Sequence, residues 1–194
     1  MVKINRIYTR TGDDGSTGLV GGTRIGKDSD RVNAYGDLDE FNAFLGMART
    51  LAEKSARQEI LTKLEIIQNE VFDIGAELAS PYGADLSNLP TVKKEQAARL
   101  EGWIDELTCN LDELTSFVLP GGTELNGMLH ITRAVCRRCE RAVIRLHQSE
   151  PISDSVRIYL NRLSDLLFAM ARFESDSARV PEYLWKPGAG SPRK

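Results

Sequence analysis

The chain has 194 residues, of which 41% are hydrophobic and 27% charged, and its net charge is −3. This length suits one large domain with a substantial core, and the small acidic balance argues against a general nucleic-acid binder, which is normally basic. The residues after Met1 lack the apolar core of a signal peptide, and no stretch approaches the roughly 18–20 apolar residues of a membrane span. Three cysteines, an odd number, argue against a disulfide framework and predict a reducing, cytoplasmic location.

The first thirty residues differ from the rest of the chain because they are rich in glycine. Glycine occupies positions 12, 15, 18, 21, 22 and 26, which is too often for a helix or a regular strand. Backbone N–H groups in such a loop can cradle phosphate oxygens, and its threonines, serines and basic residues add donors and charge. The residue order is not that of a Walker loop. A phosphate-binding loop and a mobile N-terminal arm therefore both stay open.

The remaining chain predicts five helices, over roughly residues 31–54, 60–78, 92–114, 124–147 and 153–178. The first can be capped by Asp28, Ser29 or Asp30, and the fourth by Thr123. The second carries an apolar stripe at steps of four and three. Its members are Ile60, Leu64, Ile67, Val71, Ile74 and Leu78.

No strand-like alternation is evident, so the expected fold class is all-α, a five-helix bundle. Short connections predict that the long helices are antiparallel. We expect a single domain over residues 1–194, made of a glycine-rich loop (1–30), a helical bundle (31–178) and a loose C-terminal tail (179–194).

The fourth helix contains "RAVCRRCERAVIR", which places arginines at 133, 137, 141 and 145 along one face, with Arg138 beside them. Like charges at this spacing cost about 0.2–0.5 kcal/mol per pair, and Glu140 is the only acid between residues 125 and 149. A solvated face and an oxyanion site, best suited to a polyphosphate, are both compatible with this pattern. The glycine-rich loop favours the anion site. Two elements suited to binding anions, in a protein that is acidic overall, support that interpretation more strongly than either element alone.

Two further features of the helices could be functional or could be ordinary core and surface residues. Cys136 and Cys139 resemble a metal pair, but both lie on the expected core face, and zinc would need two more ligands. We therefore predict no protein metal site. Asn161 and Asp165 share one face of the fifth helix, either as surface polar groups or as the wall opposite the arginines.

Five segments together resemble the PduO-type ATP:cob(I)alamin adenosyltransferases, in order from residue 7 to 173. They are "IYTRTGDDGSTGL", "AYGDLDEFNAFLG", "FVLPGGT", "RAVCRRCER" and "NRLSDLLFAMAR". The resemblance implies a five-helix bundle assembled as a homotrimer, with active sites between subunits. It also implies transfer of the 5′-deoxyadenosyl group of ATP, bound with Mg²⁺, to the cobalt of cob(I)alamin, which gives adenosylcobalamin and triphosphate.

The resemblance also implies roles for individual residues. The ATP-binding set comprises Thr9, Arg10, Thr11, Gly12, Thr17, Gly18, Lys27, Arg137, Arg138, Glu140, Arg141 and Asn161. The catalytic set comprises Arg137, Arg133, Asp39, Phe117 and Asp165. Within it, Asp39 would pair with Arg133 of a neighbouring subunit, Phe117 would press against the lower corrin face and exclude the axial base, and Asp165 would lie near the corrinoid.

The chain departs from the family pattern at Asp14, where many relatives carry lysine, and at Cys139, where alanine is usual. The loss of a positive charge at Asp14 is expected to weaken ATP binding. The implied protein partners are a cobalamin reductase and an adenosylcobalamin-dependent enzyme, with no nucleic acid and no membrane. Two other functions stay open: a nucleotide-binding helical adaptor without the chemistry, and an RNA-binding module that uses the arginine face.

Overall fold

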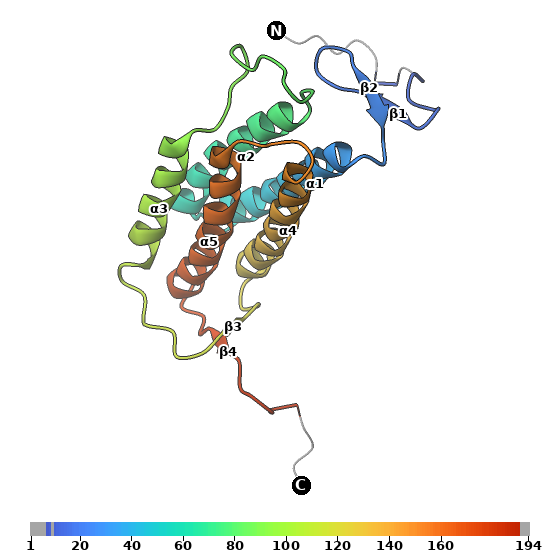
Figure 1. The fold of residues 1–194 in the computed structure, drawn as a ribbon. Helices are drawn as coiled ribbons and strands as arrows, with labels where there is room; N and C mark the ends of the chain where they lie inside the picture. Colours follow the sequence, from blue (N-terminus) through green and yellow to red (C-terminus); the bar gives the residue numbers. More distant parts are fainter. Residues whose placement is uncertain (1–6, 9, 191–194) are drawn as a thin grey trace.

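The computed structural model describes residues 7–8 and 10–190, which contain five helices and four short strands (Figure 1). The helices are α1 (Asp30–Lys54), α2 (Gln58–Leu78), α3 (Lys94–Thr108), α4 (Glu124–His147) and α5 (Asp154–Ser177). The strands are β1 (Ser16–Gly18), β2 (Arg24–Gly26), β3 (Val118–Leu119) and β4 (Tyr183–Leu184). The prediction of a mainly helical, five-helix fold is confirmed.

Three helices begin at side-chain caps, two of which, Ser29 and Thr123, were predicted from the sequence. Ser29, Thr123 and Ser153 accept hydrogen bonds from the backbone N–H three residues further on, at 3.3, 3.0 and 3.4 Å. Each cap satisfies a donor that the first helical turn leaves without a partner. The caps therefore fix where α1, α4 and α5 start.

The helices pack in the order α2, α1, α4, α5, α3, so that α4 lies between α1 and α5. One apolar cluster draws on all five helices, and the six-residue stripe of α2 is almost entirely buried within it. The pairing of α4 with α5 follows from the short connection between them, residues 148–153. None of the described helices combines the length and the apolar character that crossing a bilayer requires.

Helix α3 is shorter at its C-terminus than the sequence predicted. It ends at Thr108 rather than near residue 114, and a turn follows in which the Leu111 N–H donates to the Thr108 carbonyl at 3.0 Å. Asn110 and Asp112 favour turns over helix because their side chains compete for nearby backbone groups. The segment from 109 to 117 is thus released from the helix and runs toward β3.

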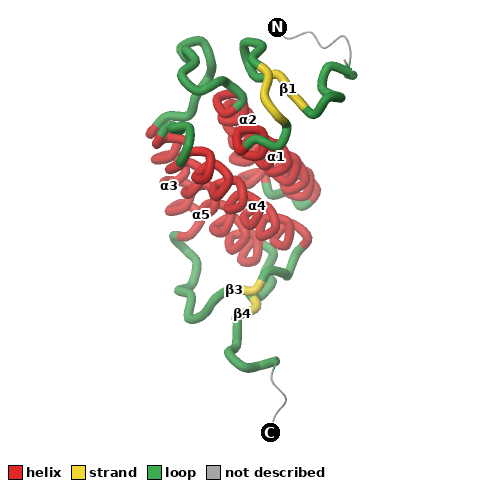
Figure 2. Tube along the Cα trace, turned by 45° about the vertical axis from the view of Figure 1, so that its right-hand side comes forward, coloured by secondary structure: helices red, strands yellow, loops and turns green. Residues whose placement is uncertain are grey.

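The prediction that the chain has no strands is wrong, and the C-terminal segment is not simply a loose tail. β1 pairs antiparallel with β2, while β3 pairs antiparallel with β4, so that Val118 lies opposite Leu184. Figure 2 shows these two small sheets at opposite ends of the bundle. The β3–β4 ladder anchors the C-terminal segment beside the start of α4.

The turn between β3 and α4 depends on two glycines. Gly121 and Gly122 have φ values of 142° and 115°, which side chains rarely adopt. A Cβ at Gly122 would lie 3.2 Å from Cγ1 of Val180, so the C-terminal segment also packs too closely for a side chain there. This turn brings the segment around Phe117 next to α4 and α5.

Candidate active site

A cavity of about 1030 Å³ opens between α4, α5 and the two segments that form β3 and β4. Its polar lining includes Arg133, Arg137 and Asp165, and its apolar lining includes Phe117, Phe168 and Trp185. The volume is at the upper end of the range for small-molecule sites, about 300–1,000 Å³. A bulky ligand with both an apolar face and an anionic part suits this lining.

The helices supply the rigid wall of the cavity. Arg133 and Arg137 are one turn apart on α4, and Asp165 and Phe168 occupy the facing side of α5. The Arg133 guanidinium lies 6.0 Å from the centroid of the Phe168 ring, within cation–π range. Its Nε is buried without a hydrogen-bond partner among the described residues. Asp165 therefore lines the cavity together with the arginines, whereas Asn161, the other member of the expected wall, is not among the lining residues.

The opposite wall is apolar and comes from segments outside the helices. Phe117 is 78% exposed, and its ring lies edge to face with that of Trp185 at a centroid distance of 6.2 Å. The Trp185 N–H donates to the Phe117 carbonyl at 2.8 Å, and the Ser116 hydroxyl donates to the Trp185 carbonyl at 2.7 Å. An aromatic side chain held this open to solvent is typical of a surface that meets a ligand. Sequence reasoning missed Trp185, although a cluster of large apolar residues at 183–185 in the C-terminal segment is an available signal.

His130 lies beside the polar wall and is 3% exposed. Its ring packs edge to face against Phe168, with a centroid distance of 6.0 Å, and neither ring nitrogen has a partner among the described residues. Burial, and then the positive charge of Arg133, lower the pKa of His130 to about 4. The imidazole is therefore neutral at physiological pH and adds no charge to the cavity wall.

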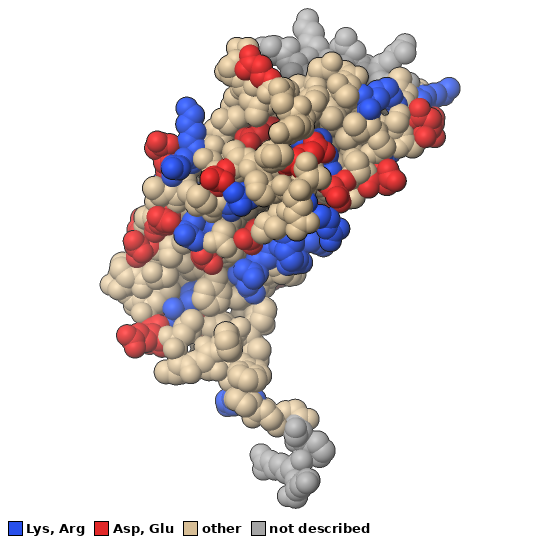
Figure 3. Space-filling model, in the orientation of Figure 1, with Lys and Arg blue, Asp and Glu red and all other residues tan. Residues whose placement is uncertain are grey.

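The arginines that α4 carries at 133, 137, 138, 141 and 145, here called the arginine ladder, differ in whether they have an acidic partner within the chain. Arg138 forms ion pairs with Glu40 and, at 3.9 Å, with Asp37 on α1. Glu140 accepts a hydrogen bond from the Asn161 amide at 3.1 Å, which joins α4 to α5. Arg141 is exposed, and Figure 3 shows basic side chains gathered on the face over α4. Three predicted ATP-binding groups, Arg138, Glu140 and Asn161, thus have partners within the chain, while Arg141 and the cavity-lining Arg137 are exposed.

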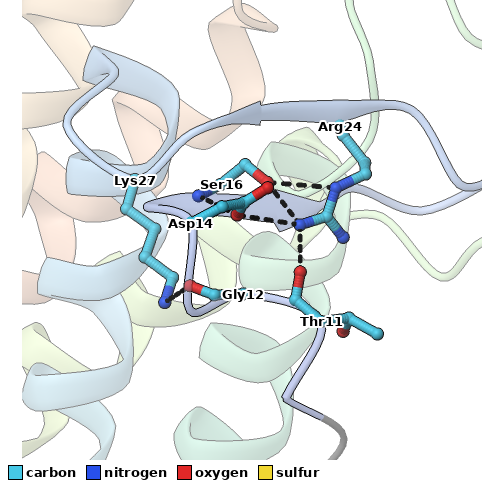
Figure 4. A network of polar contacts seen from close by, with 6 residues as sticks. All are labelled: Thr11, Gly12, Asp14, Ser16, Arg24 and Lys27. Atoms are coloured by element: carbon cyan, nitrogen blue, oxygen red, sulfur yellow. Dashed lines mark hydrogen bonds and ion pairs between the residues drawn. The ribbon is translucent and has the colours of Figure 1, made fainter.

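The glycine-rich segment folds as the β1–β2 hairpin around an internal polar network (Figure 4). The Arg24 guanidinium donates to the Ser16 hydroxyl and to the Thr11 carbonyl, and the Lys27 ammonium donates to the Gly12 carbonyl at 2.7 Å. The Arg24 and Lys27 side chains therefore already donate hydrogen bonds to oxygen atoms of the same segment. A phosphate that binds to these two side chains must replace those oxygens as the acceptor.

Asp14 takes part in the same network. Its carboxylate accepts from the Ser16 backbone N–H at 2.9 Å and from the Ser16 hydroxyl at 2.7 Å, and it lies 3.5 Å from the Arg24 guanidinium. These hydrogen bonds, followed by the charge of Arg24, hold the pKa of Asp14 below its usual value. Asp14 therefore partly neutralises an arginine of the loop.

The other ATP-binding candidates of this segment have varied positions. Thr17 and Gly18 lie in β1, and the Arg10 guanidinium sits 5.7 Å from the centroid of the Tyr8 ring. Thr9 lies outside the described residues. The Val20 N–H donates to the carbonyl of Ala79 at 2.9 Å, which ties the hairpin to the end of α2. Within one chain, the hairpin and the β3–β4 end of the cavity are at opposite ends of the bundle (Figure 1).

Asp39 lies in a second, smaller groove of about 320 Å³ between α1 and α2. Tyr35 and Phe72 also line this groove, and Phe72 is 69% exposed. Asp37, two residues earlier, approaches Arg138 on α4, so Asp39 points to a different face of α1. Asp39 and Arg133 therefore lie on different faces of the same chain.

The two cysteines of α4 are core residues, as their positions on the helix predicted. The Cys136 thiol donates to the Leu160 carbonyl at 3.5 Å and the Cys139 thiol to the Asp37 carbonyl at 3.0 Å. Burial raises the pKa of both thiols, that of Cys139 to about 12. Across residues 7–8 and 10–190, no three His, Cys, Asp or Glu side chains are grouped as a metal site.

Comparisons with known proteins agree with this geometry. Residues 7–174 match the sequence profile of the family described as cobalamin adenosyltransferase. The chain is 43% identical over 190 residues to a corrinoid adenosyltransferase from Mycobacterium tuberculosis, covering 96% of each chain. It is 46% identical over 170 residues to the corrinoid adenosyltransferase of Bacillus subtilis, covering 86% of this chain and 85% of that one.

A solved structure extends the comparison to three dimensions. It is that of a variant PduO-type ATP:corrinoid adenosyltransferase from Lactobacillus reuteri, complexed with cobalamin and ATP. The two share 36% sequence identity and a TM-score of 0.88, over 93% of this chain and 99% of the other. The profile match and these near-full-length relatives lead to one conclusion: the chain belongs to the PduO-type cobalamin adenosyltransferase family.

Proposed function

We propose that this protein is an ATP:corrinoid adenosyltransferase that forms adenosylcobalamin from cob(I)alamin and ATP. The cobalt of cob(I)alamin attacks C5′ of ATP with its electron pair and forms the Co–C bond. The C5′–O5′ bond breaks at the same carbon, and its electron pair leaves with the triphosphate. Because cob(I)alamin is itself the nucleophile, the reaction needs no general base from the protein.

The observation that carries this proposal is the two-sided cavity. Phe117 and Trp185 offer an apolar surface for a corrin ring, and Arg133 and Arg137 stand across from them. A triphosphate leaving group gains negative charge as the C–O bond breaks, and cations aimed at developing charge stabilise a transition state. The same arrangement would hold C5′ and cobalt in line, which lowers the entropic part of the barrier. Phe117 would exclude the axial base from the lower corrin face, and Asp165 would lie near the corrinoid.

The active form we propose is a homotrimer, with ATP bound between chains. Asp39 and Arg133 lie on different faces of one chain, so a pair between them needs a second copy. The groove around Asp39 is lined by apolar groups and edged by an exposed Phe72, as expected of a surface that another subunit covers. The glycine-rich segment of one chain would then meet the α4 and α5 residues of the next, and its ATP-binding candidates are Thr9, Arg10, Thr11, Gly12, Thr17, Gly18 and Lys27. The α4 and α5 residues are Arg137, Arg138, Glu140, Arg141 and Asn161.

Magnesium would enter with the triphosphate, since phosphate oxygens and water are its usual ligands in nucleotide sites. The three free thiols suit a reducing, cytoplasmic setting. There, a cobalamin reductase would supply the cob(I)alamin and an adenosylcobalamin-dependent enzyme would take the product.

Anaerobic assay with ATP, Mg²⁺ and chemically reduced cobalamin tests the proposed reaction. In dim light the expected product has the spectrum of a Co–C bonded cobalamin, is lost on illumination, and forms together with one triphosphate per turnover. Folded protein that binds ATP but yields neither product would instead be a nucleotide-binding adaptor.

A further inference from the structure

Arg172, near the end of α5, is not among the residues assigned to the site, yet it contacts both segments of the apolar wall. Its Nε lies 3.1 and 3.3 Å from the two carboxylate oxygens of Glu182, and its Nη2 lies 3.2 Å from one of them. The same Nη2 donates to the Asp112 carbonyl at 2.8 Å. The Arg172 guanidinium thus binds the Asp112 carbonyl in the segment after α3 and the Glu182 carboxylate just before β4.

These two points control the residues that line the cavity. Beyond Asp112 the chain reaches Phe117 and β3, and beyond Glu182 it enters β4 and reaches Trp185. The β3–β4 ladder and the hydrogen bonds between Phe117 and Trp185 join the two segments to each other. Those contacts fix the segments relative to one another, whereas Arg172 fixes both relative to the helices.

The position of Arg172 on α5 suits this task. Asp165, Phe168 and Arg172 are spaced by three and four residues, so they share one face of the helix. The first two line the cavity, and neither Arg172 nor Glu182 does. The Arg172 side chain is 11% exposed and that of Glu182 is 19% exposed, so their charge-assisted hydrogen bonds are shielded from water and from salt.

We propose that Arg172 is a positioning residue for the corrinoid, which sets the distance between the aromatic wall of Phe117 and Trp185 and the helical wall of Arg133 and Asp165. This proposal rests on the adenosyltransferase function. Arginine is suited to the role because its planar fork can bind a carboxylate and a carbonyl at once, whereas the single ammonium of lysine cannot hold both in a fixed geometry.

The test compares Arg172→Met with the double variant Arg172→Met/Glu182→Leu. The single variant leaves a shielded carboxylate without its cation, which costs stability by itself. The double variant removes both charges, so it should recover most of the lost melting temperature, yet it still lacks the tether. In both variants we expect the KM for cob(I)alamin to rise about tenfold, as the loss of charge-assisted hydrogen bonds would give, with the KM for ATP unchanged. Arg157→Met, which removes a surface ion pair with Asp154 at the other end of α5, should change neither constant.

A spectroscopic readout separates this proposal from the proposed reaction. The chain has two tryptophans, so a Trp103→Phe background leaves Trp185 as the only one. In that background, and without any corrinoid, Arg172→Met/Glu182→Leu should shift the Trp185 emission to longer wavelength, as the ring leaves Phe117 and becomes more hydrated. Hydroxocobalamin, titrated as a non-reacting probe, should quench this emission with a dissociation constant about tenfold weaker than in the parent.

The outcomes are distinct. Unchanged Trp185 emission in the folded double variant, or an equal rise in both KM values, would overturn the positioning role. If the wild-type protein forms no adenosylcobalamin in the assay, the proposed reaction is overturned. The Trp185 emission of the double variant would still show whether Arg172 positions the aromatic wall.

Discussion

Trp185 and Phe117 lie edge to face, with ring centroids 6.2 Å apart, and the Trp185 backbone N–H donates to the Phe117 carbonyl at 2.8 Å. The contact joins a residue of the C-terminal segment to a residue of the segment before α4. Because both rings line the cavity, the C-terminal segment contributes directly to the apolar surface on which a corrin would rest.

Replacing Trp185 by alanine should therefore weaken corrinoid binding selectively. The loss of one aromatic partner removes about 0.5–1.5 kcal/mol beyond the area it buries, so the KM for cob(I)alamin should rise about tenfold. Trp185→Phe keeps an aromatic edge and should retain most of the affinity. Steady-state kinetics with each substrate varied in turn measure the effect, and a matching rise in the KM for ATP would contradict it.

Arg137 should matter for turnover far more than Arg145. Both are exposed arginines on one face of α4, but Arg137 lines the cavity, and Arg145 lies two turns away in the last turn of the helix. Removal of a donor aimed at developing negative charge costs about 10²–10³ in kcat. We expect Arg137→Ala to show a loss of this order and Arg145→Ala to stay within about twofold, because a distant exposed charge is screened. Comparable rates in the two variants would show that Arg137 does not act on the triphosphate.

The pair between Asp39 and Arg133 can be tested by complementation between chains. Asp39→Arg and Arg133→Asp should each lower turnover at least tenfold, because each places like charges across the proposed interface. Co-expression of the two variants creates interfaces in which the opposite charges meet again, together with interfaces of wild-type sequence. Activity should then recover in the mixed oligomers. No recovery from chains that demonstrably co-assemble would argue that the two residues do not meet across subunits.

The sequence predicted the helical elements well because their signals are local. A cap such as Ser29 or Thr123 acts on a backbone group three residues away, and the stripe of α2 repeats within a few turns. The β3–β4 pair carries no such signal, since Val118 meets Leu184 through strands of only two residues each. Trp185 of the aromatic wall thus escaped prediction, whereas Phe117 was expected from the family resemblance and the charged residues of α4 and α5 from their spacing.

The same distinction applies to the arginine ladder. Its spacing predicted a shared face, but the partner of each arginine depends on the neighbouring helix. Arg138 reaches Glu40 on α1, while Arg133 and Arg137 turn to the cavity beside α5. Which arginines stay available to a ligand is therefore decided by helix packing, and this lies beyond the pattern within one helix.

Asp14→Asn should strengthen ATP binding. The asparagine side chain keeps an acceptor for the Ser16 N–H but removes the negative charge beside Arg24. Exposed charge pairs are worth about 0.2–1 kcal/mol, so the KM for ATP should fall by a factor of about 1.4 to 5, and the difference should shrink at high salt. Asp13→Asn is the matched control, since it changes the net charge equally at the adjacent exposed position. An equal fall in both variants would trace the effect to net charge rather than to contact with Arg24.

His130 should make the folded protein sensitive to mild acid. Its pKa is lowered to about 4 in the folded state, from an ordinary value of 6.5. Between pH 6.5 and about 4, His130 is therefore protonated in the unfolded chain but neutral in the folded chain. The free energy of unfolding decreases as the pH falls from about 6.5 toward 4. A shift of this size corresponds to about 3 kcal/mol of unfolding free energy, on top of the effects of other groups.

His130→Phe isolates this contribution. The substitution keeps a ring against Phe168 and sacrifices no hydrogen bond among the described residues, because neither imidazole nitrogen has a partner there. Its stability at pH 7.5 should therefore stay close to that of the wild type. Glu77, whose pKa burial raises, titrates alike in both proteins and cancels in the comparison. Denaturant unfolding at fixed protein concentration from pH 7.5 to 4.5 should show a steeper loss for the wild type, whereas parallel curves would mean that folding leaves the pKa of His130 unshifted.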